Sequence, residues 1–128
     1  MIAKSLRNWR KPTPSEFSLL RRLLSKPFEG NEQIRAQLEF AQVAEIDSQH
    51  SLRFSTSRDA TAAKTLERVP VEARATDGDG VTINVLLHVV DGFVHELEIY
   101  KDDSSGILVQ PNAEEFDVVV HRNDYRPF

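Results

Sequence analysis

Cysteine is absent from the 128-residue sequence, which excludes disulfide bonds, thiolate metal sites and cysteine nucleophiles. Long hydrophobic runs are absent too, since no segment reaches the roughly 18 apolar residues that cross a bilayer. The opening MIAKSLRNWRKPTP contains no apolar stretch of the kind found in signal peptides. We therefore expect a cytoplasmic protein that has no membrane partner.

Charge is unevenly spread along the chain. The net charge is −4, yet residues 1–28 hold seven Lys or Arg and a single Glu, a local charge of +6, which leaves −10 for the remainder. An acidic body repels nucleic acid and attracts basic partners. The basic stretch has one aromatic residue, Trp9, and no RNA-binding motif. We expect no nucleic-acid partner, and we expect this stretch to pair with the acidic part of its own domain.

Size and composition predict an ordinary single domain. Hydrophobic residues make up 40% and charged residues 28% of the chain, which is typical of soluble proteins that fold without disulfide bonds or structural metals. We predict one domain over residues 1–128, a monomer or weak dimer with no cofactor. Its parts are a basic arm (1–12), two helices (13–41), an antiparallel sheet (42–121) and a tail (122–128).

Helix signals gather in the first third of the chain. Thr13-Pro14-Ser15-Glu16 is a capping box with proline at the first helical position, and Pro27 ends the helix that follows. Gly30-Asn31 opens a second helix that runs to about Ala41. Because helices precede strands without β-α-β alternation, we predict an α+β domain. Its two N-terminal helices pack on one face of a largely antiparallel, meander-type β-sheet.

The strongest strand signal is a hairpin that turns at Asp91-Gly92. Two apolar-rich runs, 81–90 (VTINVLLHVV) and 93–100 (FVHELEIY), flank this dipeptide, which is favoured in two-residue type I′ loops. Such a loop places His88 opposite His95. In this register the face packed on the helices carries Val90, Phe93, His88, His95, Leu86, Leu97, Asn84 and Ile99. The second face carries Ile83, Val85, Leu87, Val89, Val94, Glu96, Glu98 and Tyr100.

The second hairpin face is predicted to be exposed or covered by a partner. Glu72 and Arg74, from a strand over 69–76 that ends at a Gly78-Asp79 loop, border its apolar residues. An apolar strip rimmed by charge marks interaction sites, although ordinary sheet surfaces and strips covered by the chain's own terminus are about as common. Further strands are expected over 43–47, 52–55, 107–109 and 116–121, with a loop or a short helical turn over 56–66.

Two histidines form the sharpest candidate site for chemistry. Opposed on one face, His88 and His95 lie close enough to share a metal ion or to couple their titrations. Zinc sites need three or four ligands, however, and no third ligand projects from neighbouring positions. We therefore favour two neutral, hydrogen-bonded histidines at the rim of the core. The alternative is a small-ligand or metal-binding enzyme that uses His88 and His95.

Other catalytic patterns are weaker. Glu96 and Glu98 lie two residues apart on one strand, a spacing that glycosidases use, but carboxylates that face solvent or a partner fit the pattern better. Phosphate-binding and nucleophile-elbow motifs are absent from the sequence. We predict no catalytic residue and no metal site.

Residues 86–108 (LLHVVDGFVHELEIYKDDSSGIL) resemble a signature of a large family of small uncharacterised bacterial proteins. In that signature an Asp-Gly turn and an ELEIY-like strand precede a polar turn, and the resemblance extends over roughly 12–108. Families of this kind look like those that supply immunity proteins to bacterial toxin systems, including contact-dependent growth inhibition. The resemblance implies a binding protein that neutralises a cognate toxin domain, for example a nuclease.

A basic toxin domain would be met by acidic surface residues. The residues expected to contact it, on the second hairpin face or in the turn that follows, are Glu72, Glu96, Glu98, Tyr100, Asp102 and Asp103. Opposite charges speed association, and a buried aromatic anchor such as Tyr100 supplies much of the affinity. A structural subunit whose second face pairs with itself is a further interpretation.

Overall fold

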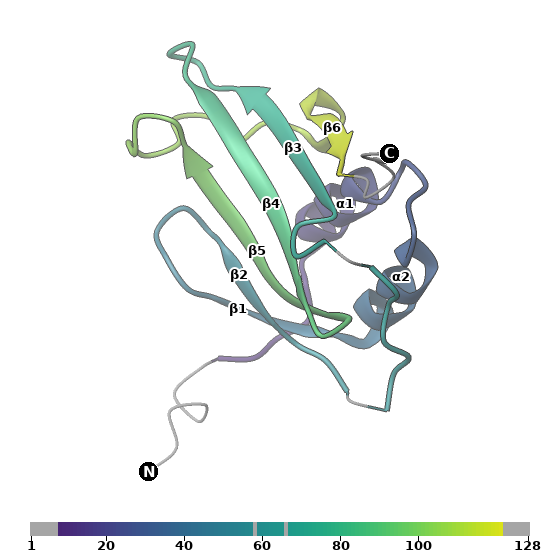
Figure 1. Ribbon diagram of the computed structural model, residues 1–128. Helices are drawn as coiled ribbons and strands as arrows, with labels where there is room; N and C mark the ends of the chain where they lie inside the picture. Colours follow the sequence, from purple (N-terminus) through teal and green to yellow (C-terminus); the bar gives the residue numbers. More distant parts are fainter. Residues whose placement is uncertain (1–7, 58, 66, 122–128) are drawn as a thin grey trace, which may run out of the picture.

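The computed structural model describes residues 8–57, 59–65 and 67–121. Two helices, α1 (Pro14–Leu23) and α2 (Asn31–Phe40), come first. The strands are β1 (Gln42–Glu45), β2 (Leu52–Ser55), β3 (Val71–Thr76), β4 (Thr82–Val90), β5 (Phe93–Lys101) and β6 (Asp117–Val120), and a short 3-10 helix, η2 (Ala113–Glu115), precedes β6. The six strands form one sheet in the order β1-β2-β5-β4-β3-β6 (Figure 1), and the pairings between these strands are all antiparallel. The predicted α+β class is confirmed, while the outer part of the basic arm (1–7) and the predicted tail (122–128) lie outside the described residues.

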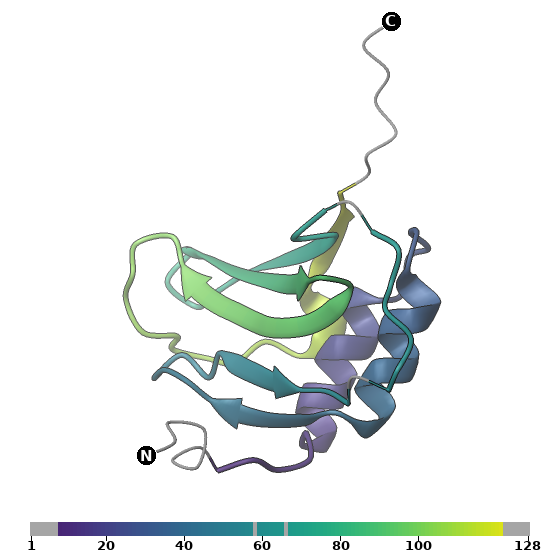
Figure 2. The same ribbon diagram turned by 60° about the horizontal axis from the view of Figure 1, so that its bottom comes forward.

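Both helices lie side by side on one face of the sheet, which we call the inner face (Figure 2). The predicted capping box starts α1, because Thr13 Oγ1 accepts from Glu16 N at 3.2 Å and the Glu16 carboxylate accepts from Thr13 N at 2.8 Å. The apolar stripe of each helix is buried in the core, through Leu19, Leu20 and Leu23 of α1 and Ile34 and Leu38 of α2. Within the described ranges, neither helix is long and apolar enough to span a bilayer.

A β-bulge in β5 changes the predicted register of the central hairpin. The turn pairs Val90 with Phe93 as predicted, and Asp91 (φ 53°) and Gly92 (φ 83°) both have the positive φ that a type I′ turn needs. His95 is then an extra residue, so His88 lies opposite Glu96. The prediction that His88 faces His95 is therefore wrong, because turn chemistry sets the register only as far as the first bulge.

The bulge also reverses which side of β4 is buried. The inner face of this strand carries Ile83, Val85, Leu87 and Val89, none of which is more than 5% exposed. We predicted these four residues to lie on the opposite face, together with Glu96 and Glu98. On β5 the prediction holds beyond the bulge, since Leu97 and Ile99 are buried, but it is wrong before the bulge, where Val94 is buried in place of Phe93 and His95. The β4 sequence alternates accordingly, since its inner positions are all apolar whereas the other positions include Thr82, Asn84 and His88. The prediction instead followed the apolar residues of β5 through a register without a bulge, and so chose the wrong side of β4.

The turn between β3 and β4 is wider than predicted. Asp77 N donates to Val81 O at 2.9 Å, so Ala75 pairs with Ile83. The predicted Gly78-Asp79 loop would have paired Ala75 with Thr82, one position earlier. The predicted inward side of β3 is nevertheless correct, because Val71, Ala73 and Ala75 are all buried. The expected strand over 107–109 is not formed, and the described residues of 56–66 contain no helix.

Basic residues of the N-terminal part bind acceptors along the two borders of the sheet. Arg10 pairs through its backbone with Val43 of β1 and through its guanidinium with Glu16 at 2.7 Å. Arg22 Nε donates to Phe116 O at 3.0 Å, and Lys26 Nζ donates to Val118 O at 2.8 Å. The expected pairing with the acidic part of the domain is confirmed only for Arg10, whose Nη2 also lies 3.6 Å from Glu45 Oε2. Arg22 and Lys26 bind backbone carbonyls instead of carboxylates.

Candidate functional site

Four of the predicted contact residues lie on the outer face of the sheet, away from the helices: Glu72, Glu96, Glu98 and Tyr100. Each of the three glutamates has a cationic or imidazole neighbour. Glu96 lies 3.5 Å from Arg53 Nη2, and Glu98 lies 2.8 Å from His88 Nε2. Glu72 lies 2.9 Å from Arg74 Nη2 and also contacts His121. The outer face is therefore a mosaic of paired charges, not the acidic surface that the sequence predicted.

The two candidate histidines lie apart from any ligand set. His88 accepts from Arg68 Nε through Nδ1 at 3.2 Å, so its proton lies on Nε2, which faces Glu98. Burial, followed by the nearby Arg53 guanidinium, lowers the pKa of His95. Among the described residues, no group of three or more His, Asp or Glu side chains is placed to hold a metal ion. His88 alternates with the buried Leu87 and Val89, so it points outward instead of lining the core as predicted.

A second candidate site lies at the end of the sheet where three turns meet (Figure 1). Gln49 joins two of these turns, because its side chain donates to Ser105 O at 2.7 Å and accepts from Ile107 N at 3.2 Å. The charged residues of this acidic end are Asp47, Asp77, Asp79, Lys101, Asp102 and Asp103. Five carboxylates and one ammonium group give it a net charge of −4.

Lys101 is the centre of the acidic end. Its side chain has no exposed surface, and Nζ lies 2.9 Å from Asp77 Oδ2 and 2.7 Å from Asp79 Oδ2. Asp77 also accepts from the backbone N–H groups of Leu108 at 2.7 Å and Val109 at 3.0 Å. The Leu108 bond, more than the Lys101 ammonium, holds the pKa of the Asp77 carboxyl far below its usual range. The two aspartates in turn raise the pKa of Lys101, so the cluster is an ion pair that fixes the 106–109 segment.

Asp102 and Asp103, like Asp47, have hydrogen bonds only to neutral groups in the described part of the chain. Asp102 accepts from Asn84 Nδ2 at 2.7 Å, and Asp103 accepts from the Ser105 hydroxyl at 2.6 Å. The Ser105 bonds lower the pKa of Asp103, so it stays ionised. Three large side chains at the acidic end are exposed. Tyr100, near the end of β5, is 40% exposed, and Leu108 and Val109, in the segment after β5, are 66% and 65% exposed. The sequence predicted a strand over 107–109 and therefore missed the last two.

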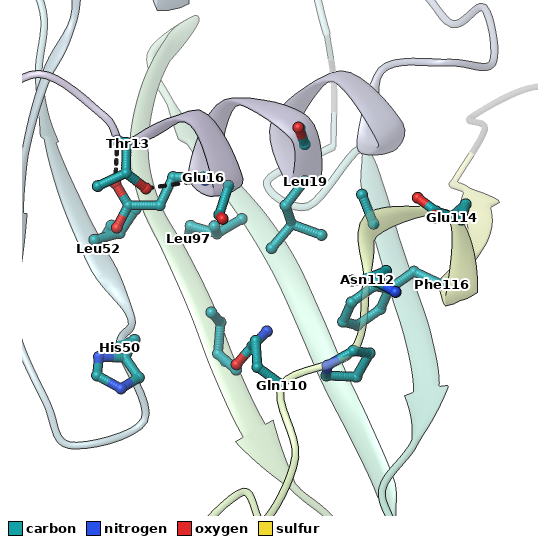
Figure 3. A pocket seen from close by; sticks show the side chains of 15 residues that line it. Thr13, Glu16, Leu19, His50, Leu52, Leu97, Gln110, Asn112, Glu114 and Phe116 are labelled. Carbon is teal, nitrogen blue, oxygen red and sulfur yellow. Dashed lines mark hydrogen bonds between the residues drawn. The ribbon is translucent and has the colours of Figure 1, made fainter.

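A cavity of about 520 Å³ opens between α1, the inner face of the sheet and residues 110–116. Figure 3 shows Leu19 of α1 above it, Leu52 and Leu97 on the sheet side, and Gln110 extending from the opposite wall. The cavity borders the acidic end, because its lining residues His50 and Gln110 directly follow Gln49 and the exposed Val109. Sequence reasoning missed this cavity, since its size depends on how much of the sheet α1 covers.

Comparison with known families places most of this structure in a shared segment. Residues 9–111 match a family described as "Domain of unknown function (DUF6984)". No curated protein and no solved structure matches the chain. The matched segment contains both helices, strands β1 to β5 and the whole acidic end.

Proposed function

We propose that this chain, which belongs to the DUF6984 family, is a binding protein that neutralises a basic partner by docking its acidic end onto it. The observation that carries this proposal is the position of Asp102 and Asp103. Their charges have no cationic hydrogen-bond partner among the described residues, and exposed Tyr100, Leu108 and Val109 lie beside them. Apolar anchors next to unpaired carboxylates fit a partner that has the opposite charge.

The acidic end is a better docking surface than the outer sheet face. Glu96 and Glu98 already face Arg53 and His88, so a basic partner would have to compete with groups that are fixed in place. Asp102 and Asp103 require no such exchange. Long-range attraction between a surface of net charge −4 and a basic protein raises the association rate, and salt reduces this effect. Contacts from Glu72, Glu96 and Glu98 are therefore secondary in this proposal.

The partner that we propose is a bacterial toxin domain, which makes this chain an immunity protein. Support for the toxin comes from the signature-like stretch 86–108, whose resemblance points to immunity families. Its polar turn contains Asp102 and Asp103, so the resembling segment and the proposed docking surface coincide. The experiment first requires a search of the adjacent genes for one that encodes a small basic toxin-like domain, which is then produced as a purified inactive variant.

A double charge reversal tests the proposal. Asp102→Lys/Asp103→Lys should lower the association rate about tenfold at low salt and much less at high salt, and should abolish growth protection against the active toxin. The matched control is Glu32→Lys/Glu39→Lys, which makes the same charge change at two exposed positions of α2. Equal effects of the two double variants, or no effect of the first, would overturn the proposed surface.

The alternative of a metal-binding or small-ligand enzyme at His88 and His95 gains no support from the geometry. His95 is the extra residue of the bulge, and His88 is held between Arg68 and Glu98.

A further inference from the structure

We propose that the cavity beside α1 receives a long basic side chain of the partner, with arginine the best fit. This inference rests on the proposed function, because the basic side chain comes from the protein that docks on the acidic end. Three features of the cavity favour such a side chain: an apolar floor, a capped helix end and an acceptor-rich rim.

The floor of the cavity is apolar. Leu52 and Leu97 are each 1% exposed and Ile99 6% exposed, yet all three line the cavity. These side chains present a narrow hydrocarbon surface between α1 and the sheet. The methylene stem of a lysine or arginine packs well on such a surface while its charged head stays at the polar rim.

The start of α1 is closed to an anion. Free N–H groups at a helix N-terminus normally attract phosphate or carboxylate. Here the Thr13 hydroxyl accepts from Glu16 N, and the Glu16 carboxylate accepts from Thr13 N. Arg10 neutralises that carboxylate from outside with two bonds, at 2.7 Å and 2.9 Å. The capping box thus occupies two N–H groups of the helix end that borders the cavity, and the carboxylate placed there would repel an anion.

The rim opposite α1 is rich in acceptors. The cavity lining includes Gln110, Asn112 and the exposed Glu114, and none of the described residues that line it is Lys or Arg. A bond from Asn112 N to the Glu115 carboxylate at 2.6 Å holds this turn in shape. A guanidinium group has five N–H donors in a planar fork, which suits one carboxylate and neighbouring amide oxygens better than an ammonium group does.

The cavity borders the proposed docking surface, the acidic end. Two residues that line the cavity, His50 and Gln110, directly follow Gln49 and Val109 of the acidic end. A partner seated on the acidic end is therefore within reach of the cavity. Residues that dominate interface affinity typically insert an anchor side chain into a pocket of the partner.

Small probes test the inference without the partner. N-acetyl-arginine amide and its neutral isostere N-acetyl-citrulline amide are titrated into the protein, and methyl shifts of Leu52, Leu97 and Ile99 are followed by NMR. We expect saturable shifts and at least fivefold tighter binding of the arginine probe. Equal binding of the two probes, shifts elsewhere in the protein, or no saturation would overturn the inference.

Variants locate the bound group. Glu114→Gln should weaken the arginine probe about threefold and leave the citrulline probe unchanged, whereas the control Glu32→Gln should change neither. Ser18→Trp fills the cavity and should abolish binding of both probes, while Ser25→Trp, at an exposed site near the other end of α1, should not. A Glu114→Gln protein that binds both probes as the wild type does would contradict the charge recognition.

The two proposals fail in different ways. If Asp102→Lys/Asp103→Lys slows partner binding while Ser18→Trp and Glu114→Gln do not weaken it, the docking surface stands and the arginine pocket is wrong. If the cavity binds the arginine probe but the aspartate reversal leaves partner binding unchanged, the proposed function is wrong.

Discussion

Lys101 Nζ lies 2.9 Å from Asp77 Oδ2, and neither side chain has any exposed surface. Strand β5 supplies the lysine, and the β3–β4 turn supplies the aspartate. Asp77 also accepts from the backbone N–H groups of Leu108 and Val109. The ion pair therefore joins the end of β5, the β3–β4 turn and the segment that leads to the cavity. The shape of the acidic end therefore depends on this pair.

Removing the ammonium group should unfold the acidic end. Lys101→Met leaves Asp77 buried without its cation, which is strongly destabilising, and we expect the melting temperature to fall on the order of 10 °C. Thermal unfolding followed by circular dichroism measures this. Lys64→Met, at an exposed position, is the matched control. If the two variants melted together, the ion pair would not hold the fold.

Acid should weaken the same cluster. The Asp77 pKa lies below its ordinary value of 3.8, so the unfolded chain binds more protons than the folded chain when the pH falls. The stability from this group is complete above the unfolded pKa and is lost as pH drops from about 4 toward the folded pKa. The melting temperature of the wild type should therefore fall more steeply below pH 4 than that of Asp77→Asn. Parallel curves would contradict this assignment.

Deleting His95 should be tolerated, because the bulge residue has no partner position in β4. Without it, Val94 and Glu96 keep their partners Val89 and His88, and inward and outward side chains alternate without interruption. We expect a loss of no more than about 1 kcal/mol in unfolding free energy, an ordinary cost of a single change. Deleting Glu98 is the control, since it turns Ile99 outward and should prevent folding. A His95 deletion that also failed to fold would show that the bulge itself is required.

Two glycines with the same backbone angle should respond differently to alanine. Gly80 and Gly92 both have φ +83°, but an added Cβ meets nothing within 4 Å at Gly80, whereas at Gly92 it lies 2.7 Å from Ala63 O. Gly80→Ala should cost about 1 kcal/mol from backbone strain alone. Gly92→Ala should cost at least twice as much, because the hairpin turn must move away from the 60–63 segment. Urea unfolding gives both values, and equal values would mean that this contact is not tight.

Local signals in the sequence predicted most elements of the fold. Thr13 and Glu16 marked the start of α1, and Asp91-Gly92 marked the hairpin turn; in each case the residues that signal the structure also make its bonds. Glu72 and Tyr100 were correctly placed on the outer face. Such features depend on neighbours a few positions away, which a sequence displays directly.

Features that depend on distant neighbours were missed. The bulge at His95 was also missed, although the strictly apolar alternation of Ile83, Val85, Leu87 and Val89 in β4 indicates the buried side. The burial of Lys101 depends on the β3–β4 turn, 22 and 24 residues earlier in the chain. The cavity depends on the distance between α1 and residues 110–116. No local pattern encodes the last two relations.

Side-chain contacts at the edge strand β6 oppose extension of this sheet by a second copy of the protein. Its outward carbonyls at Phe116 and Val118 accept from Arg22 and Lys26 of the same molecule. A second copy that tried to extend the sheet there by strand addition would have to displace two cations from their acceptors. Concentrated solutions of the protein should therefore resist fibril growth from this border, and Arg22→Ala/Lys26→Ala would remove that protection.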